Sequence, residues 1–135
     1  MEWKQEVEKI AKGTLMEALG MEILELEKGR VVGKMPVDER TVQPFKILHG
    51  GASAAFAETL GSLGSYVVLK DTDNYAVGLE LNANHIRPAS SGFVYGEAIL
   101  IHGGRTTHIW EIKITNEEKK LVCASRLTMI VKQKQ

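Results

Sequence analysis

The chain of 135 residues has the length of a typical single domain, and a chain of this size buries about two thirds of the surface that it exposes when unfolded. Lys and Arg together number 17, as do Asp and Glu, and 44% of the residues are hydrophobic, a balance that argues against disorder. Because the formal net charge is zero, the chain lacks the basic surface that binding to a nucleic-acid backbone requires. We therefore expect one domain over residues 1–135 and no nucleic-acid partner.

Three features of the sequence bear on cellular location. The first residues carry charges where a secretory signal has an apolar core, so we expect no export signal. Cys123 is the single cysteine, which excludes an intrachain disulfide and is typical of a reducing compartment. Residues 50–69 have the length of a membrane span and one ionisable group, Glu58, but their many Ala, Gly and Ser residues leave too little apolar side chain. We expect a cytoplasmic protein that does not enter a membrane.

Residues 1–20 are predicted to form one or two short helices, because apolar residues recur there at helical spacing. Thr14 and Glu17 have the spacing of a capping box at the start of the second helix. Gly20 is the expected helix end. The chain is therefore predicted to begin with a helical segment over residues 1–20 that Gly13 interrupts.

Alternating hydrophobic runs follow, and they predict strands. Residues 22–26 and 30–37 are separated by a short turn that contains Gly29, which predicts a hairpin. After residue 74 the alternation places Val77 and Leu79 on one face of a strand. Short connections favour antiparallel neighbours. Further strands are predicted at residues 77–83, 94–100, 108–114 and 121–131. The expected fold is an α+β domain in which an antiparallel sheet wraps around one long central helix, residues 50–69.

The central helix is rich in small residues, which allow a curved sheet to approach it closely. We expect the sheet to enclose most of its circumference, and packing to offset about 1 kcal/mol of lost helix propensity for each glycine relative to alanine. The small residues are Ala52, Ala54, Ala55, Ala57, Gly61 and Gly64.

The start of this helix carries a candidate site. Gly50 and Gly51 open it, and the N–H groups of a first turn, together with the helix dipole, favour an anion or a developing oxyanion. Glu58 follows two turns later in a stretch without other charge, where a lone carboxylate is costly unless it is paired or borders a wet cleft. Together these groups suit acyl transfer. The sequence is equally consistent with an exposed or ion-paired Glu58 and a simple glycine turn.

A second polar cluster falls at predicted strand ends. His85 and Arg87 end one strand, and Arg105 and Thr106 open another. If these ends lie together, their side chains could hold phosphate groups; the alternative is solvated charges at exposed strand ends. The four histidines have none of the ligand spacings typical of zinc, so no metal is expected.

Three segments resemble the hotdog-fold acyl-CoA thioesterases: residues 43–53 (QPFKILHGGAS), 57–62 (AETLGS) and 77–87 (VGLELNANHIR). The chain is most similar to the PaaI-like branch with a catalytic glutamate, which includes hydroxybenzoyl-CoA and dihydroxynaphthoyl-CoA thioesterases, and the likeness extends over residues 21–131. It implies a hotdog fold and the following roles. Glu58 is the nucleophile or general base, the Gly50 N–H polarises the thioester carbonyl, Gln43 and His49 place the substrate, and Ser62 positions the attacking water.

The resemblance also implies partners and a reaction. The active site would lie between two subunits of a homodimer, with the glutamate contributed across the interface, and dimers would pair into tetramers. His85, Arg87 and Arg105, with the adjacent Thr106, would be candidates to contact the CoA nucleotide, which is part of the substrate, so no separate cofactor is expected. The expected reaction is hydrolysis of an acyl-CoA, preferably aromatic, to free acid and CoA. The alternatives are a non-catalytic module that binds acyl-CoA or an acyl carrier, and a hydroxyacyl-thioester dehydratase.

Overall fold

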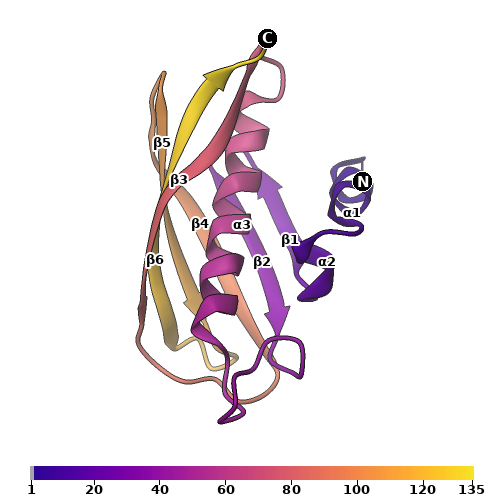
Figure 1. The fold of residues 1–135 in the computed structure, drawn as a ribbon, viewed down its shortest axis with the longest axis vertical. Helices are drawn as coiled ribbons and strands as arrows, with labels where there is room; N and C mark the ends of the chain where they lie inside the picture. The colour runs from indigo at the N-terminus through magenta and orange to yellow at the C-terminus, as the bar shows by residue number, and fades with distance from the viewer. Residues whose placement is uncertain (1) are drawn as a thin grey trace.

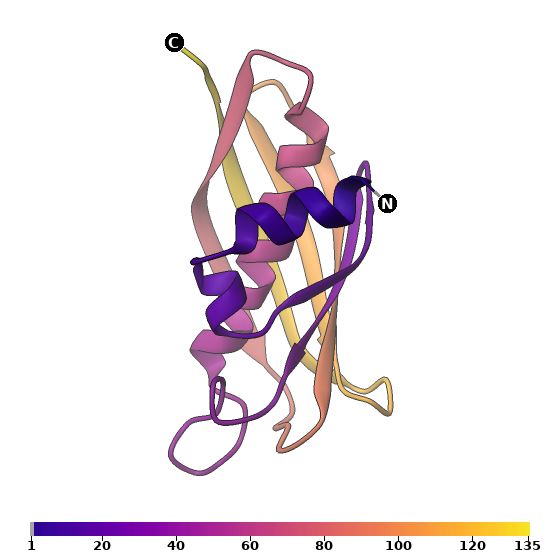
Figure 2. The same ribbon diagram turned by 90° about the vertical axis from the view of Figure 1, so that its right-hand side faces the viewer.

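The computed structural model describes residues 2–135, and Met1, the first residue of the predicted N-terminal segment, lies outside the described residues. A curved antiparallel sheet of six strands wraps around one long helix (Figure 1). Figure 2 shows a short helix crossing the side of the long helix that the sheet leaves open. The predicted α+β class is confirmed. The helices are α1 (Glu2–Ala11), α2 (Leu15–Ala18) and α3 (Gly50–Leu69), and the strands are β1 (Glu22–Glu27), β2 (Arg30–Pro36), β3 (Asn74–His85), β4 (Phe93–Gly103), β5 (Thr107–Thr115) and β6 (Leu121–Gln133).

The N-terminal segment folds into α1 and α2, but the predicted capping box is wrong. The Thr14 hydroxyl donates to the Ala11 carbonyl over 2.6 Å instead of capping α2, and Glu17 Oε1 accepts from the N–H of Gly13 over 3.2 Å. Gly13, with a φ of 76°, turns the chain sharply between the two helices, so the Thr14 side chain faces the end of α1. Gly20, with a φ of 71°, follows the end of α2 as expected.

The sheet has the strand order β1-β2-β4-β5-β6-β3. Hairpins join β1 to β2, β4 to β5 and β5 to β6, in agreement with the short connections between them. Strand β3 differs, because it pairs with β6 and not with β4, which follows it in the chain. The connection over residues 86–92 therefore crosses the end of the sheet instead of forming a tight turn (Figure 1). Strand β3 is left as an edge strand of 12 residues.

The small residues of α3 let it lie close to the sheet, as predicted. A Cβ atom added at Gly61 would lie 2.5 Å from Cδ2 of Leu127, and one added at Gly64 would overlap the Trp110 ring, at 2.6 Å from Cζ2. Between these contacts the core is filled by large buried side chains, among them Phe56, Leu60, Ile112, Ile114 and Met129. Among residues 2–135, no helix combines the length and apolar composition needed to span a membrane.

A buried polar network ties the middle of α3 to β5. The Trp110 Nε1–H donates to Ser65 Oγ over 2.8 Å, and the same Oγ is hydrogen-bonded to His108 Nδ1 over 2.8 Å. Burial lowers the pKa of His108, and the neighbouring His102 lowers it further, so the folded chain favours the neutral imidazole. Because every member of the network is buried, it fixes which face of α3 points at the sheet.

Most of α3 is enclosed as expected, but one stripe of it is left uncovered in the single chain. Gly51, Glu58 and Tyr66 are exposed along one side of the helix, because the sheet covers the opposite side and α1 and α2 cover only part of the rest. Val77 and Leu79, predicted on one face of a strand, are 42% and 61% exposed. They lie on the free edge strand β3, whose register against β6 shifts beside them.

The contact between α3 and the sheet gives a stability prediction. Gly64→Ala should lower the free energy of unfolding by about 1 to 3 kcal/mol, because the added methyl overlaps the buried Trp110 ring, although alanine is the better helix former. Urea denaturation of the variant and the parent measures this difference. A variant more stable than the parent would mean that the Trp110 contact does not limit how closely α3 approaches the sheet.

Candidate active site

The first turn of α3 presents one free backbone donor. His49 is the N-cap: its Nδ1 accepts from the N–H of Gly51 over 2.7 Å, and its carbonyl accepts from Ala52 at 3.0 Å and Ser53 at 3.2 Å. The N–H of Gly50 has no acceptor among residues 2–135. Because the helix dipole places positive potential at this end, the Gly50 N–H can hydrogen-bond an anion or an oxyanion.

The loop before α3 holds Gln43 in one conformation. The Gln43 N–H donates to the Ile47 carbonyl over 2.9 Å, and the Gln43 carbonyl accepts from Lys46 over 2.8 Å. The side-chain oxygen of Gln43 accepts from the N–H of Phe45. Lys46 has a φ of 66°, which closes this tight loop. The Gln43 amide nitrogen has no acceptor in the described chain, so its two N–H groups remain available to a ligand.

His85 and Arg87 join Gln43 and Gly50 in one cavity of about 410 Å³. The His85 ring lies directly against Gly50, since a Cβ atom added there would be 2.8 Å from His85 Nε2. Arg87 donates through Nη1 to the Leu121 carbonyl over 2.8 Å, which fixes the guanidinium at the end of β3. The cavity thus brings the free backbone N–H of Gly50 together with the side-chain amide of Gln43 and the guanidinium of Arg87.

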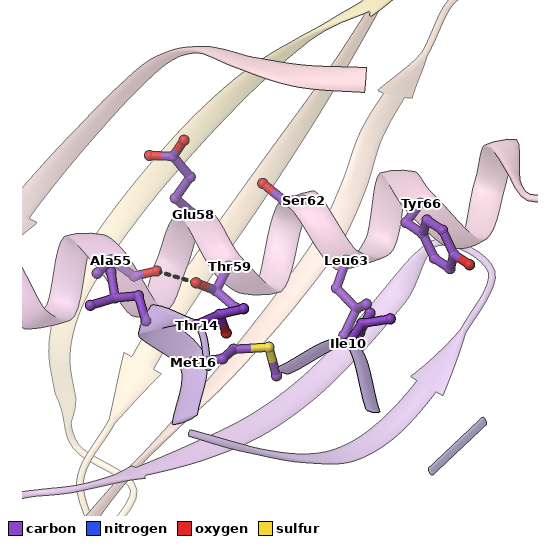
Figure 3. Close-up of a pocket in the computed structure, with 10 residues that line it drawn as sticks. Ile10, Thr14, Met16, Ala55, Glu58, Thr59, Ser62, Leu63 and Tyr66 are labelled. Carbon is purple, nitrogen blue, oxygen red and sulfur yellow. Dashed lines mark hydrogen bonds between the residues drawn. The ribbon is translucent and has the colours of Figure 1, made fainter. Parts of the chain in front are cut away.

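Glu58 and Ser62 open on a second cavity, of about 590 Å³, between α3 and the two N-terminal helices. Figure 3 shows the Glu58 and Ser62 side chains pointing to one side of α3, whereas Leu63 points to the other side, toward Met16 and Ile10. The cavity therefore has a carboxylate and a hydroxyl along one border and an apolar wall along the other.

The Glu58 carboxylate is exposed and has no ion-pair partner within residues 2–135. Its Oε2 lies against the backbone of Gly78 in β3, and Figure 3 shows it directed away from the N-terminal helices. The Ser62 hydroxyl donates only a weak hydrogen bond, to Met129 Sδ over 3.6 Å. Both groups are thus free to contact a ligand at the free edge of the sheet.

Tyr66, which lines the second cavity, belongs to a polar cluster that joins α1 to the end of α3. The Tyr66 hydroxyl donates to Glu6 Oε1 over 2.7 Å, and Lys70 Nζ bonds to Glu6 Oε2 over 3.1 Å. These two hydrogen bonds hold the pKa of Glu6 below its usual value and fasten α1 across α3. The four-residue spacing of Ser62 and Tyr66 places them on one helix face, and both line this cavity.

Arg105 and Thr106 are not brought to the other site residues in the single chain. The Thr106 carbonyl accepts from Val131 near one end of β6, whereas His85 pairs with Cys123 near the other. Eight residues of strand separate these points, which is about 26 Å. Within the described part of the chain, no three His, Cys, Asp or Glu residues gather closely enough to hold a metal ion.

The amide donor and the carboxylate are separated along a single rigid helix. Glu58 follows Gly50 by eight residues, and at 1.5 Å per residue they lie about 12 Å apart along the axis. They also line different cavities. One cavity can therefore bind a carbonyl oxygen and anionic groups, and the other offers a base or nucleophile beside an apolar space.

A family model described as "Thioesterase superfamily" matches residues 45–123, more than half of the chain and all of α3. The chain belongs to the thioesterase superfamily. As a member it is a thioester hydrolase.

Solved structures resemble this thioesterase in fold and sequence, and a relative resembles it in sequence. A variant of thioesterase PA1618 of Pseudomonas aeruginosa is 42% identical, with a TM-score of 0.92 over 96% of this chain and 94% of that chain. Two variants of SAV0944 of Staphylococcus aureus are each 45% identical to this chain. The variant with a glutamine replaced by alanine has a TM-score of 0.84 over 87% of this chain and 98% of its own. The variant with a glutamate replaced by alanine has a TM-score of 0.85 over 88% of this chain and 98% of its own. A 1,4-dihydroxy-2-naphthoyl-CoA hydrolase of Listeria monocytogenes is 45% identical over 120 residues, 89% of this chain and 97% of that protein. The expected hotdog fold is confirmed.

The cap at His49 gives a prediction for this thioesterase. His49→Ala should lower the free energy of unfolding by about 1 kcal/mol, because the Gly51 N–H loses its acceptor, and His49→Asn should recover most of that loss. Thermal unfolding of the two variants measures the difference. Equal destabilisation by Ala and Asn would contradict the capping role of the imidazole.

Proposed function

We propose that this thioesterase hydrolyses an acyl-CoA, preferably one with an aromatic acyl group, in an active site shared by two copies of the chain. The observation that carries the proposal is the separation of Gly50 and Glu58 by about 12 Å on one helix. A carbonyl under attack needs its oxygen within about 3 Å of a donor and its carbon near the base or nucleophile. One chain supplies both groups but cannot direct them at the same carbonyl.

Strand β3 is the proposed contact between the two copies. It is an edge strand, and Val77 and Leu79 leave apolar side chains exposed along it, which makes it a template for pairing. Glu58 lies against Gly78 in the middle of this strand, and His85 lies against Gly50 at its end. Antiparallel pairing of the two β3 strands could place His85 of one copy near Gly78 of the other. Because Gly50 lies beside His85 and Glu58 lies beside Gly78, this pairing would bring the Gly50 N–H of one copy near the Glu58 carboxylate of the other. Such dimers are further proposed to pair into tetramers.

Each polar group then has a role in hydrolysis. Glu58 either adds to the thioester carbonyl or takes a proton from the water that does, and Ser62, one turn further along α3, orients that water. The Gly50 N–H holds the oxyanion, and Gln43 with His49 places the substrate. The carbon–sulfur bond then breaks, and CoA leaves as a thiolate, which needs no strong acid. Where Glu58 has added to the carbonyl, this step leaves a mixed anhydride, which the water oriented by Ser62 then hydrolyses to the free acid and the Glu58 carboxylate. In the SAV0944 variants the replaced glutamine and glutamate are 15 residues apart, as are Gln43 and Glu58, which supports these roles.

The two cavities suggest how the substrate is divided. The apolar wall formed by Ile10 and Met16 suits the acyl group, and the likeness to a dihydroxynaphthoyl-CoA hydrolase supports an aromatic one. His85 and Arg87 suit the CoA phosphates, and Arg105 with Thr106 would reach the coenzyme only from another copy. The proposed compartment is the cytoplasm, in keeping with the single, buried thiol of Cys123.

Replacement of the carboxylate tests the function directly. Glu58→Gln should lower kcat for release of thiol from benzoyl-CoA by at least about 100-fold, because the amide can neither attack nor accept the proton. Binding of CoA should stay close to that of the parent, since the cavity with His85 and Arg87 is untouched. Colorimetric thiol release and calorimetric CoA binding measure the two effects. Hydrolysis at the parent rate would refute the assignment of Glu58.

A further inference from the structure

Gly78 is a glycine that neither the backbone nor the core requires. Its φ lies outside the left-handed region, so any residue could adopt its conformation. It is also exposed, unlike Gly33 and Gly96, at which an added Cβ atom would meet the buried Leu60 side chain. The need for a glycine at this point of β3 must therefore come from something else.

The group opposite Gly78 is the Glu58 carboxylate. A Cβ atom at position 78 would overlap Glu58 Oε2 and would lie 3.3 Å from Cδ and 4.0 Å from Cγ. No other heavy atom approaches that position as closely. The register between β3 and β6 shifts between Gly78 and Glu80, so the strand is locally irregular beneath the carboxylate. The carboxylate thus occupies the space that any side chain at this position would take.

We propose that Gly78 is a positioning residue for Glu58. The missing side chain lets the carboxylate lie on the strand backbone at the free edge of the sheet, where the second copy is proposed to pair. This inference rests on the proposed function, because it assumes that Glu58 reacts with a substrate held by the partner. A reacting group displaced by about 1 Å can lose about 100-fold in rate, so a single methyl group is enough to matter.

Gly78→Ala should therefore lower the activity of the enzyme without lowering its stability. The atom in the way is the far end of a flexible side chain, so the Glu58 side chain can rotate aside without a shift of the backbone. We expect kcat for benzoyl-CoA to fall by about 100-fold with KM, the unfolding midpoint and the molar mass by light scattering unchanged. Gly103→Ala is the matched control, since it adds a methyl at an exposed strand glycine whose nearest neighbour is Leu100 Cδ2 at 3.1 Å. It should keep the parent kcat.

A shorter acid provides the decisive comparison. Glu58→Asp withdraws the carboxylate from position 78, so Gly78→Ala added to Glu58→Asp should lower kcat no further than Glu58→Asp alone. If the fold-loss in kcat of the double variant equals the product of the losses of the two single variants, Gly78 acts independently of the carboxylate and the proposal is overturned. A change in molar mass accompanying the loss of kcat would also overturn it, because Gly78 would then act through assembly.

The failure of this inference is distinguishable from failure of the proposed function. If Glu58→Gln is inactive while Gly78→Ala keeps the parent kcat, the positioning role is refuted and the function stands. If Glu58→Gln keeps the parent kcat, the proposed role of Glu58 fails, and the positioning role fails with it.

Discussion

The rigidity of α3 is the constraint on which the whole site depends. A helix advances 1.5 Å for each residue and does not bend back on itself, so an amide at its first turn and a carboxylate eight residues later cannot converge on one carbonyl. Gly50 faces a cavity at the end of the sheet, and Glu58 lies at the free edge of β3. The single chain therefore presents the two groups at separate places, and the proposed dimer would combine the Gly50 N–H of one copy with the Glu58 carboxylate of the other.

The packing of α3 against the sheet fixes where Gly50 and Glu58 lie. Gly61 and Gly64 allow Leu127 and Trp110 to approach the helix axis, and the hydrogen bonds of Ser65 prevent the helix from turning about that axis. The side of α3 opposite these contacts is consequently left open. The N-terminal helices partly cover it, held by the hydrogen bonds of Glu6, and form the space into which we place the acyl group.

Features set by local sequence were predictable, and features set by long-range contacts were not. The bounds of α3 match the predicted residues 50–69 because its composition changes sharply at both ends, and Gly29, with a φ of 90°, makes the predicted hairpin turn. The capping box failed because the sharp turn at Gly13 redirected the Thr14 hydroxyl. No spacing in the sequence indicates that β3 pairs with β6, yet this pairing separates Arg105 from His85 and exposes Leu79.

Activity of mixed dimers tests most directly whether the site is shared. Glu58→Gln and Gln43→Ala chains, each inactive alone, should regain activity when they are produced together, because a hybrid dimer contains one site with an intact Gln43 and Gly50 from one chain and Glu58 from the other. With random pairing, half of the dimers are hybrids with one complete site, so about a quarter of the parent activity should return. Activity of the mixture no greater than the sum of the two separate variants would contradict a site built from two copies.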